Sequence, residues 1–171
     1  MKRLLLGLAA AVVFAPPALA RAPQPVRAVA TTLFSGRWYE IARTPNMAQK
    51  DCQGSSSDFS GWVSGAFAVT QVCHKGSPQG PVKTFNAKAK ILPASGNAKM
   101  KMSFFGGLVS QEYWILDHAD DDNWAIMATP GGNYVWVLSR RPVLDPAAKA
   151  VALQRVHTLG YDLSRLAYPQ Q

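Results

Sequence analysis

The sequence predicts an all-β domain of about eight strands, folded as a barrel or sandwich, with one α-helix near its C-terminal end. Short strand-like runs begin at Gly36 and follow one another roughly every eight to fifteen residues, with turn residues between them. Two of these runs alternate between apolar and polar positions, which is the period of a half-buried strand. A helical pattern occurs near residues 146–158, after the strands, so a fold of alternating strands and helices is excluded.

The first twenty residues have the organisation of a secretory signal peptide. A basic start over residues 1–3 precedes an apolar run over 4–15, and Ala18-Leu19-Ala20 forms a small-x-small cleavage site. The apolar run is too short to span a bilayer. We therefore expect residues 1–20 to be removed, which gives an exported, soluble product. No cysteine lies at the junction, so a lipid anchor is not expected there.

The mature chain is expected to begin with an arm over residues 21–35, which holds Pro23 and Pro25 and shows little periodicity. The barrel domain then covers residues 36–171. Its first five strands are expected at 37–44, 56–60, 66–74, 84–91 and 99–104. The fourth and fifth alternate most clearly, and their apolar faces comprise Phe85, Ala87, Ala89, Ile91, Met100, Met102 and Phe104.

Three later strands are apolar on both faces, at 113–116, 124–128 and 134–138. A strand of this kind needs cover on its outer side as well as its inner side. The helix expected over residues 146–158 can supply that cover. Asp145 is a suitable N-cap for it, Pro146 suits the first helical position, and the helix has a broad apolar side.

Cys52 and Cys73 are the only cysteines in the chain. Because an oxidising compartment favours joining them, export predicts a disulfide. Two thiols cannot build a zinc site, and His74, His118 and His157 lack the spacing of metal ligands. The sequence therefore predicts neither a metal site nor a cofactor.

The charge of the chain limits its partners. The formal net charge is +8, with 18 basic residues against 10 acidic ones, and Lys2 and Arg3 would leave with the signal peptide. The remaining basic residues are scattered and form no long block, so nucleic acid is not an expected partner. A solvated strand face explains them, and a weak attraction to anionic lipid headgroups is the functional alternative.

The inward-facing residues of the fourth and fifth strands leave two interpretations open. Small and flexible side chains leave space inside a barrel of about eight strands, which is the size that holds one small ligand. Methionines can also adapt to apolar guests of different shapes. Alternatively, the same side chains fill a solid core.

Four segments of the chain form a recognisable set: Gly36-Arg37-Trp38-Tyr39-Glu40-Ile41-Ala42-Arg43, Met102-Ser103-Phe104-Phe105-Gly106, Tyr113-Trp114-Ile115-Leu116-Asp117 and Tyr134-Val135-Trp136-Val137-Leu138-Ser139-Arg140-Arg141-Pro142. They resemble segments of the lipocalin family, most closely those of the group of bacterial outer-membrane lipocalins (Blc) and apolipoprotein D. They stand in the order and spacing of that family, and the match covers about residues 34–168.

The resemblance implies an eight-stranded antiparallel up-and-down barrel with the helix packed outside. It also implies that Trp38 closes the barrel floor, with the Arg140 guanidinium laid across its indole ring as a structural contact. In that topology Cys52 and Cys73 both lie at the open mouth.

The function implied is that of a periplasmic carrier of one small lipophilic molecule, a fatty acid or lysophospholipid, in lipid transport or storage for membrane maintenance. It would be free or associated with the outer membrane without a lipid anchor. Eight side chains are expected to line the ligand site: Phe67, Val69, Phe85, Ala87, Met100, Met102, Phe104 and Trp136.

Glu40 is the one expected inward-facing carboxylate, because it shares strand parity with Trp38 and Ala42. A buried carboxylate needs a partner, either a structural hydrogen bond low in the barrel or the polar group of a ligand. No nucleophile elbow or other catalytic constellation is present, so no catalytic residue is assigned. The alternative function is an enzyme acting on a lipid or isoprenoid inside the same barrel, with Glu40 as its acid or base.

Overall fold

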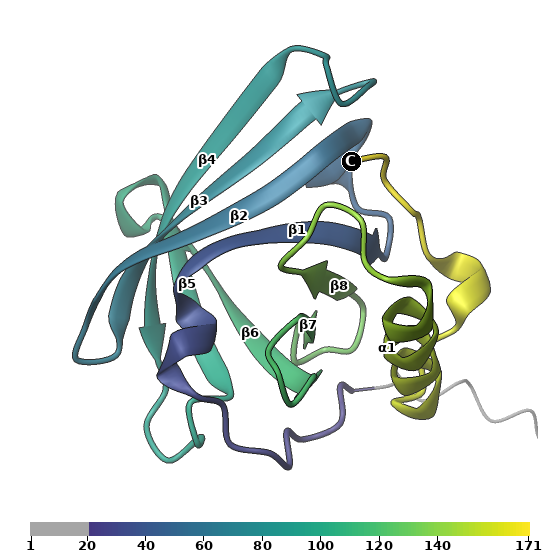
Figure 1. Ribbon diagram of the computed structural model, residues 1–171. Helices are drawn as coiled ribbons and strands as arrows, with labels where there is room; N and C mark the ends of the chain where they lie inside the picture. The colour runs from purple at the N-terminus through teal and green to yellow at the C-terminus, as the bar shows by residue number, and fades with distance from the viewer. Residues whose placement is uncertain (1–20) are drawn as a thin grey trace, which may run out of the picture.

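A computed structural model describes residues 21–171, and the expected signal peptide lies outside the described residues. Within them, eight strands close into a barrel in which each strand pairs with the next and the last pairs with the first (Figure 1). Every pairing is antiparallel. The strands are β1 (Gly36–Arg43), β2 (Cys52–Val63), β3 (Ala66–Lys75), β4 (Val82–Ile91), β5 (Lys99–Phe104), β6 (Val109–His118), β7 (Trp124–Ala128) and β8 (Val135–Ser139). The predicted up-and-down barrel is confirmed.

The barrel has an open end and a closed end. At the open end, which we call the mouth, four connections join β1 to β2, β3 to β4, β5 to β6 and β7 to β8. Two of them contain short 3-10 helices, η2 (Met47–Gln49) and η3 (Phe105–Gly107). The other connections lie at the closed end, together with the 3-10 helix η1 (Thr31–Phe34).

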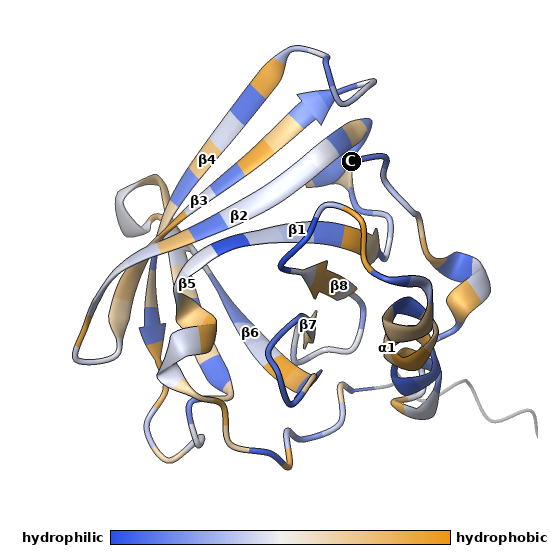
Figure 2. Ribbon diagram, in the orientation of Figure 1, coloured by the Kyte–Doolittle hydropathy of each residue, from blue (hydrophilic) through white to orange (hydrophobic). Residues whose placement is uncertain are grey.

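Two strands are longer than expected by more than two residues: β2, which is expected over 56–60, and β6, which is expected over 113–116. The register of β2 against β3 shifts twice, between Gln53 and Ser56 and again between Ser60 and Val63. The register of β6 against β7 shifts between Ile115 and Asp117. Such bulges break the two-residue period on which the sequence prediction depends. The evenly alternating β4 has no such break, and Figure 2 shows orange and blue residues alternating along it.

The helix α1 (Pro146–Thr158) lies against the outside of the barrel, as predicted (Figure 1). Asp145 caps it, since its Oδ1 accepts hydrogen bonds from the backbone nitrogens of Ala147 and Ala148 at 2.9 and 3.2 Å. Ala152 and Val156 are fully buried on its barrel side. They pack in an outer apolar cluster with the outward residues of the doubly apolar strands, including Trp114, Leu116, Trp124, Ile126, Val135 and Val137.

Residues 21–35, expected as an arm, run past the closed end and enter the barrel core. Leu33 and Phe34 are buried in the inner apolar cluster, together with Val29. Arg27 ties the same segment to Asp117 of β6, with 3.1 Å between Nη1 and Oδ1. The buried positions span only a few residues around η1, too short a stretch for hydrophobic periodicity to be visible in the sequence.

The closed end is sealed by the expected contact between Trp38 and Arg140. The guanidinium carbon lies 3.7 Å from the indole centroid. Arg140 also donates hydrogen bonds to backbone carbonyls of the η1 segment, to Ser35 O at 2.5 Å and to Leu33 O at 3.3 Å. Gly36 begins β1 with a φ of +70°, a conformation that costs a glycine little and other residues more. The glycine and the arginine of the sequence motifs therefore meet at one corner of the floor.

Candidate ligand cavity

The mouth half of the barrel encloses a cavity of about 430 Å³. Trp38 and Leu138 lie at its deepest part, and side chains from the mouth connections, such as Met47 and Tyr134, lie at its entrance. This volume falls within the range of small-molecule sites in proteins, roughly 300–1,000 Å³. The cavity is therefore large enough for one small ligand.

One wall of the cavity is apolar and aromatic. It is formed by strands β4 to β8, and its main side chains are Phe85, Phe104, Tyr113, Met127 and Trp136. The ring centroids of Tyr113 and Trp136 lie 5.8 Å apart in an edge-on arrangement. Burial raises the pKa of the Tyr113 hydroxyl, which therefore stays protonated at neutral pH. This wall offers contact area and one hydroxyl donor.

The opposite wall is polar. It comes from β1 to β3 and from η2, and it includes Glu40, Gln49, Ser55, Ser57 and Gln71. The Ser55 hydroxyl is buried and has no hydrogen-bond partner in the protein. A buried hydroxyl without a partner is costly, and a polar ligand atom could satisfy it. The cavity thus has one apolar wall and one polar wall, which suits an amphiphilic ligand.

The eight side chains expected to line the site are divided between two depths. Phe85, Phe104 and Trp136 line the cavity. The other five are not among its lining residues and lie in the tightly packed inner cluster: Phe67, Val69, Ala87, Met100 and Met102. Met100 and Met102 are fully buried there, so the expected methionine-lined wall is wrong.

The reason is an aromatic plug in the closed half. Phe34 lies 5.6 Å from Trp62 and 5.3 Å from Phe67, measured between ring centroids, and Phe59 lies 5.5 Å from Phe67. These rings fill the volume between the lower parts of the strands. The two interpretations of the interior therefore each hold for one half of the barrel: the closed half is solid and the mouth half is hollow.

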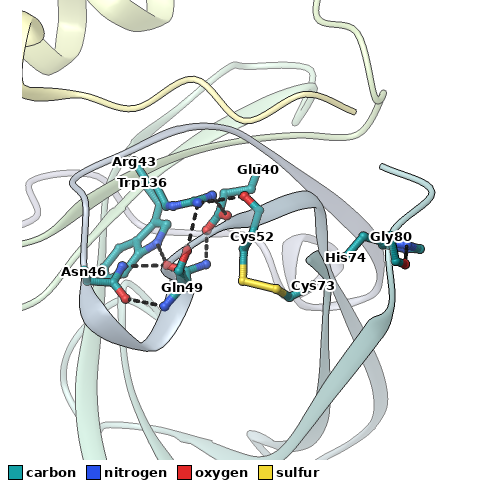
Figure 3. Close-up of a disulfide and its surroundings, with 9 residues drawn as sticks. All are labelled: Glu40, Arg43, Asn46, Gln49, Cys52, Cys73, His74, Gly80 and Trp136. Carbon is teal, nitrogen blue, oxygen red and sulfur yellow. Dashed lines mark hydrogen bonds and ion pairs between the residues drawn. A yellow bond between two sulfur atoms is a disulfide. The ribbon is translucent and has the colours of Figure 1, made fainter. Parts of the chain in front are cut away.

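Glu40 lies in a buried network beside the cavity (Figure 3). Its Oε2 accepts a hydrogen bond from Arg43 Nη1 at 2.8 Å, and its Oε1 accepts one from Gln49 Nε2 at 2.6 Å. Burial raises the pKa of Glu40, while the positive charge of Arg43 and the hydrogen bond from Gln49 act in the opposite direction. Both carboxylate oxygens thus have partners within the protein.

Gln49 links this network to the aromatic wall (Figure 3). Its Oε1 accepts hydrogen bonds from Asn46 Nδ2 at 2.7 Å and from Trp136 Nε1 at 2.9 Å. Arg43 meanwhile donates to the Cys52 carbonyl at 2.8 Å. The expected hydrogen bond of Glu40 exists, but its partners are Arg43 at the mouth end of β1 and Gln49 in the mouth connection, and neither lies at the floor. Contact between Glu40 and a ligand stays a prediction.

Trp38, Glu40 and Ala42 are expected to point into the barrel together, because they alternate along one strand. This holds for Trp38 and Glu40 and fails for Ala42. Trp38 faces the inner cluster and Glu40 the cavity, whereas Ala42 packs in the outer cluster. The register of β1 against β8 shifts between Glu40 and Ala42, which reverses the side to which later residues point.

The predicted disulfide between Cys52 and Cys73 is present at the mouth (Figure 3). It joins the first residue of β2 to β3 near the end of that strand, and the two Cα atoms lie 5.2 Å apart. Both cysteines are buried, and Cys73 lines the cavity. The bond therefore fixes the polar wall just below the connection that carries Gln49.

Several residues that line the cavity were not predicted from the sequence, including Ser55, Ser57, Gln71, Tyr113 and Met127. Tyr113 and Ile115 face inward, while Trp114 and Leu116 pack in the outer cluster, which strand alternation alone left undecided. Across residues 21–171, no three His, Cys, Asp or Glu side chains gather as a metal site would require. In the same range, no helix combines the length and apolar character needed to cross a bilayer.

Comparison with known proteins gives one consistent family. The model of the lipocalin-like domain matches residues 29–171. The outer membrane lipoprotein Blc of Vibrio cholerae is 25% identical over 140 residues, which cover 81% of this chain and 80% of that protein. Apolipoprotein D of the mouse is 27% identical over 146 residues, covering 81% and 75% respectively. Among solved structures, insecticyanin of the tobacco hornworm superimposes with a TM-score of 0.70 at 21% identity, covering 86% of this chain and 84% of that one.

Proposed function

Because the chain belongs to the lipocalin family, whose members bind small hydrophobic ligands, we propose that it is an exported carrier of one fatty acid or lysophospholipid. The single observation that carries the proposal is the cavity of about 430 Å³, which is open at one end and has an aromatic wall. In the proposed role the protein moves or stores lipid in the periplasm for membrane maintenance. Relatives named as outer membrane lipoproteins support that setting.

The two walls suit the two parts of an amphiphile. An acyl chain against Phe85, Phe104 and Trp136 would leave water, which supplies most of the affinity. The polar group would lie toward the mouth, where the Lys83 ammonium stands 4.5 Å from the Phe85 ring centroid. Lys83 is exposed and can pair with a carboxylate or a phosphate at the entrance.

Nothing in the cavity favours the enzymatic alternative. A catalytic acid or base must be able to reach the substrate with a proton to exchange. The Glu40 carboxylate is held on both oxygens by Arg43 and Gln49, and both cysteines are joined. The carboxylate and the thiols that the enzymatic alternative would use are therefore occupied by structural contacts.

Fluorescence titration of the delipidated protein tests the proposal. Trp136 lines the cavity, so adding a long-chain fatty acid or a lysophospholipid should change its emission in a saturable way. A Trp136→Phe variant should lose most of the change. A matched Trp124→Phe variant should keep it, because Trp124 packs in the outer cluster. If no class of lipid gives saturation, the proposal fails.

Export is tested separately. We expect the mature protein to begin at Arg21 and to be recovered from the periplasmic fraction. N-terminal sequencing of that fraction checks the cleavage site, and recovery only from the cytoplasm would contradict it.

A further inference from the structure

Large apolar side chains are exposed around the mouth of the barrel. Leu108 is 88% exposed, Phe105 66% and Val82 61%. With three others they form what we call the mouth rim: Met47, Val82, Phe105, Leu108, Val109 and Tyr134. Each of the four mouth connections contributes or borders at least one of them. Exposed apolar residues that gather in one place mark an interaction site more than scattered ones do.

The rim is continuous with the cavity. Four of its six members, Met47, Phe105, Val109 and Tyr134, also line the cavity. An apolar surface therefore runs from the outer edge of the mouth to the aromatic wall inside. A lipophilic molecule could follow it without crossing water.

The connection between β5 and β6 presents the most prominent part of the rim. Phe105, Gly106 and Gly107 all have positive φ, at 51°, 70° and 101°. A bulky residue seldom adopts this conformation, because it strains the backbone. Burial of the Phe105 ring does not offset this strain, since the ring is mostly exposed to water. No charged residue lies between Phe105 and Val109. The tip is thus shaped to present an aromatic and a leucine outward.

The charges beside the rim are mostly positive. The mouth connections and the strand ends next to them, residues 44–51, 75–83, 105–109 and 129–134, carry Lys50, Lys75 and Lys83 but only one acidic residue, Asp51. The turn between β6 and β7 at the closed end carries instead Asp120, Asp121 and Asp122. Lysines beside an apolar rim match the arrangement by which proteins bind an anionic bilayer.

We infer that the mouth rim docks on the surface of a lipid bilayer that contains anionic lipids, with Phe105 and Leu108 inserted among the headgroups. The cavity then opens directly onto the membrane that supplies or receives its ligand. The inference rests on the proposed function for its purpose, but docking and cavity binding are separate events that can fail separately. It extends the weak headgroup attraction expected from composition to a defined surface.

Vesicle binding by matched variants tests this surface. The mouth variant is Val82→Thr with Leu108→Ser, since neither residue lines the cavity. The control variant is Val63→Thr with Val26→Ser, because these side chains are 69% and 90% exposed and lie near the closed end. Val26 adjoins Arg27, which pairs with Asp117 and Asp120 there. Both variants should unfold at the temperature of the parent protein.

The parent protein and the control variant should both co-sediment with vesicles of phosphatidylcholine and phosphatidylglycerol. The mouth variant should bind at least about tenfold more weakly, since two apolar side chains no longer leave water on docking. Binding should also weaken with pure phosphatidylcholine and at ~0.5 M salt, where charges are screened within a few ångströms. Fatty-acid titration of the mouth variant should match the parent, which separates failure of docking from failure of the proposed function.

Three results would overturn the inference. The first is a parent protein that fails to sediment with any vesicle, and the second is an equal loss of binding by the two variants. The third is a dimer, detected by sedimentation velocity without lipid, that only the mouth variant disrupts; the rim is then an interface between two copies of the chain.

Discussion

The two halves of this barrel are built from the same eight strands but are filled differently. In the closed half, Phe34, Phe59 and Phe67 pack against one another inside the barrel and Trp38 is wholly buried. In the mouth half, the strands enclose a cavity with a hydrogen-bonded polar wall. Dense aromatic packing gives stability that does not depend on a guest, and this allows the other half to stay hollow. Truncating the aromatic residues packed in the closed half should therefore cost mainly stability, and truncating the aromatic residues of the cavity wall should cost mainly binding.

The largest expected effect follows from Trp38→Ala. Removing a fully buried indole from the floor also removes the surface on which Arg140 lies, so we expect a loss of about 3–5 kcal/mol in the free energy of unfolding. Urea denaturation followed by circular dichroism measures it.

Trp136→Ala is the matched control for Trp38→Ala, because the same atoms are removed from the side wall of the cavity and not from the packed floor beneath it. It should destabilise the protein by clearly less and should weaken lipid binding. Equal losses of stability from the two substitutions would erase the distinction between the halves.

Removing the disulfide should have the next largest effect on stability. The bond spans a sequence separation of 21 residues, and the entropy of the closed loop predicts a loss of about 3 kcal/mol when both cysteines become serine. Thermal unfolding of this double variant, beside the parent with and without reductant, gives the value. Thiol titration must confirm that the bond of the reduced parent is broken, because both cysteines are buried. If that reduced parent is as stable as the oxidised one while the double variant is destabilised, the loss comes from the new hydroxyls and not from the missing bond.

Glu40→Gln should have a smaller effect that varies with pH. Because burial raises the pKa of Glu40 above its ordinary value of 4.5, the folded protein holds this proton at pH values where the unfolded chain has released it. Glu40 thus contributes stability below pH 4.5, and that contribution is lost as the pH rises through the folded-state pKa. The stability of the parent relative to the glutamine variant should fall across this window. A constant difference from acid to neutral pH would contradict the raised pKa.

Arg140→Lys is the smallest change. A lysine keeps the charge above Trp38 but cannot stack as a plane or reach several carbonyls at once, so we expect a loss of about 1 kcal/mol and unchanged lipid binding. Chemical denaturation and the fluorescence titration together test this. A loss of binding without a loss of stability would assign Arg140 a role in the ligand site.

The sequence predicted the strands well where alternation was regular, as in β4, and less well where bulges interrupt it, as in β2. It also identified Trp38, Arg140 and the cysteine pair, because the family resemblance and export each point to particular residues. These predictions depend on local pattern or on short motifs.

Depth within the barrel could not be predicted in the same way. Alternation states which face of a strand Met100 and Met102 occupy, but it does not state how far up the interior the packing reaches. That height is set by Phe34, which enters from a segment outside the strands. The polar wall was missed for a similar reason, since Gln49 reaches Glu40 and Trp136 from a loop whose conformation no periodic pattern encodes.

The floor contact has a consequence for the order of folding during the export that we propose. A chain that leaves a translocation channel from its N-terminal end presents Cys52 and Cys73 early and only 21 residues apart. The Arg140 contact with Ser35 spans 105 residues and must wait until nearly the whole barrel has emerged. The disulfide at the mouth can therefore form before the closed end of the barrel is sealed, and the closed end is sealed last. A pulse of thiol-blocking reagent during secretion should find the cysteines already protected before the chain resists protease.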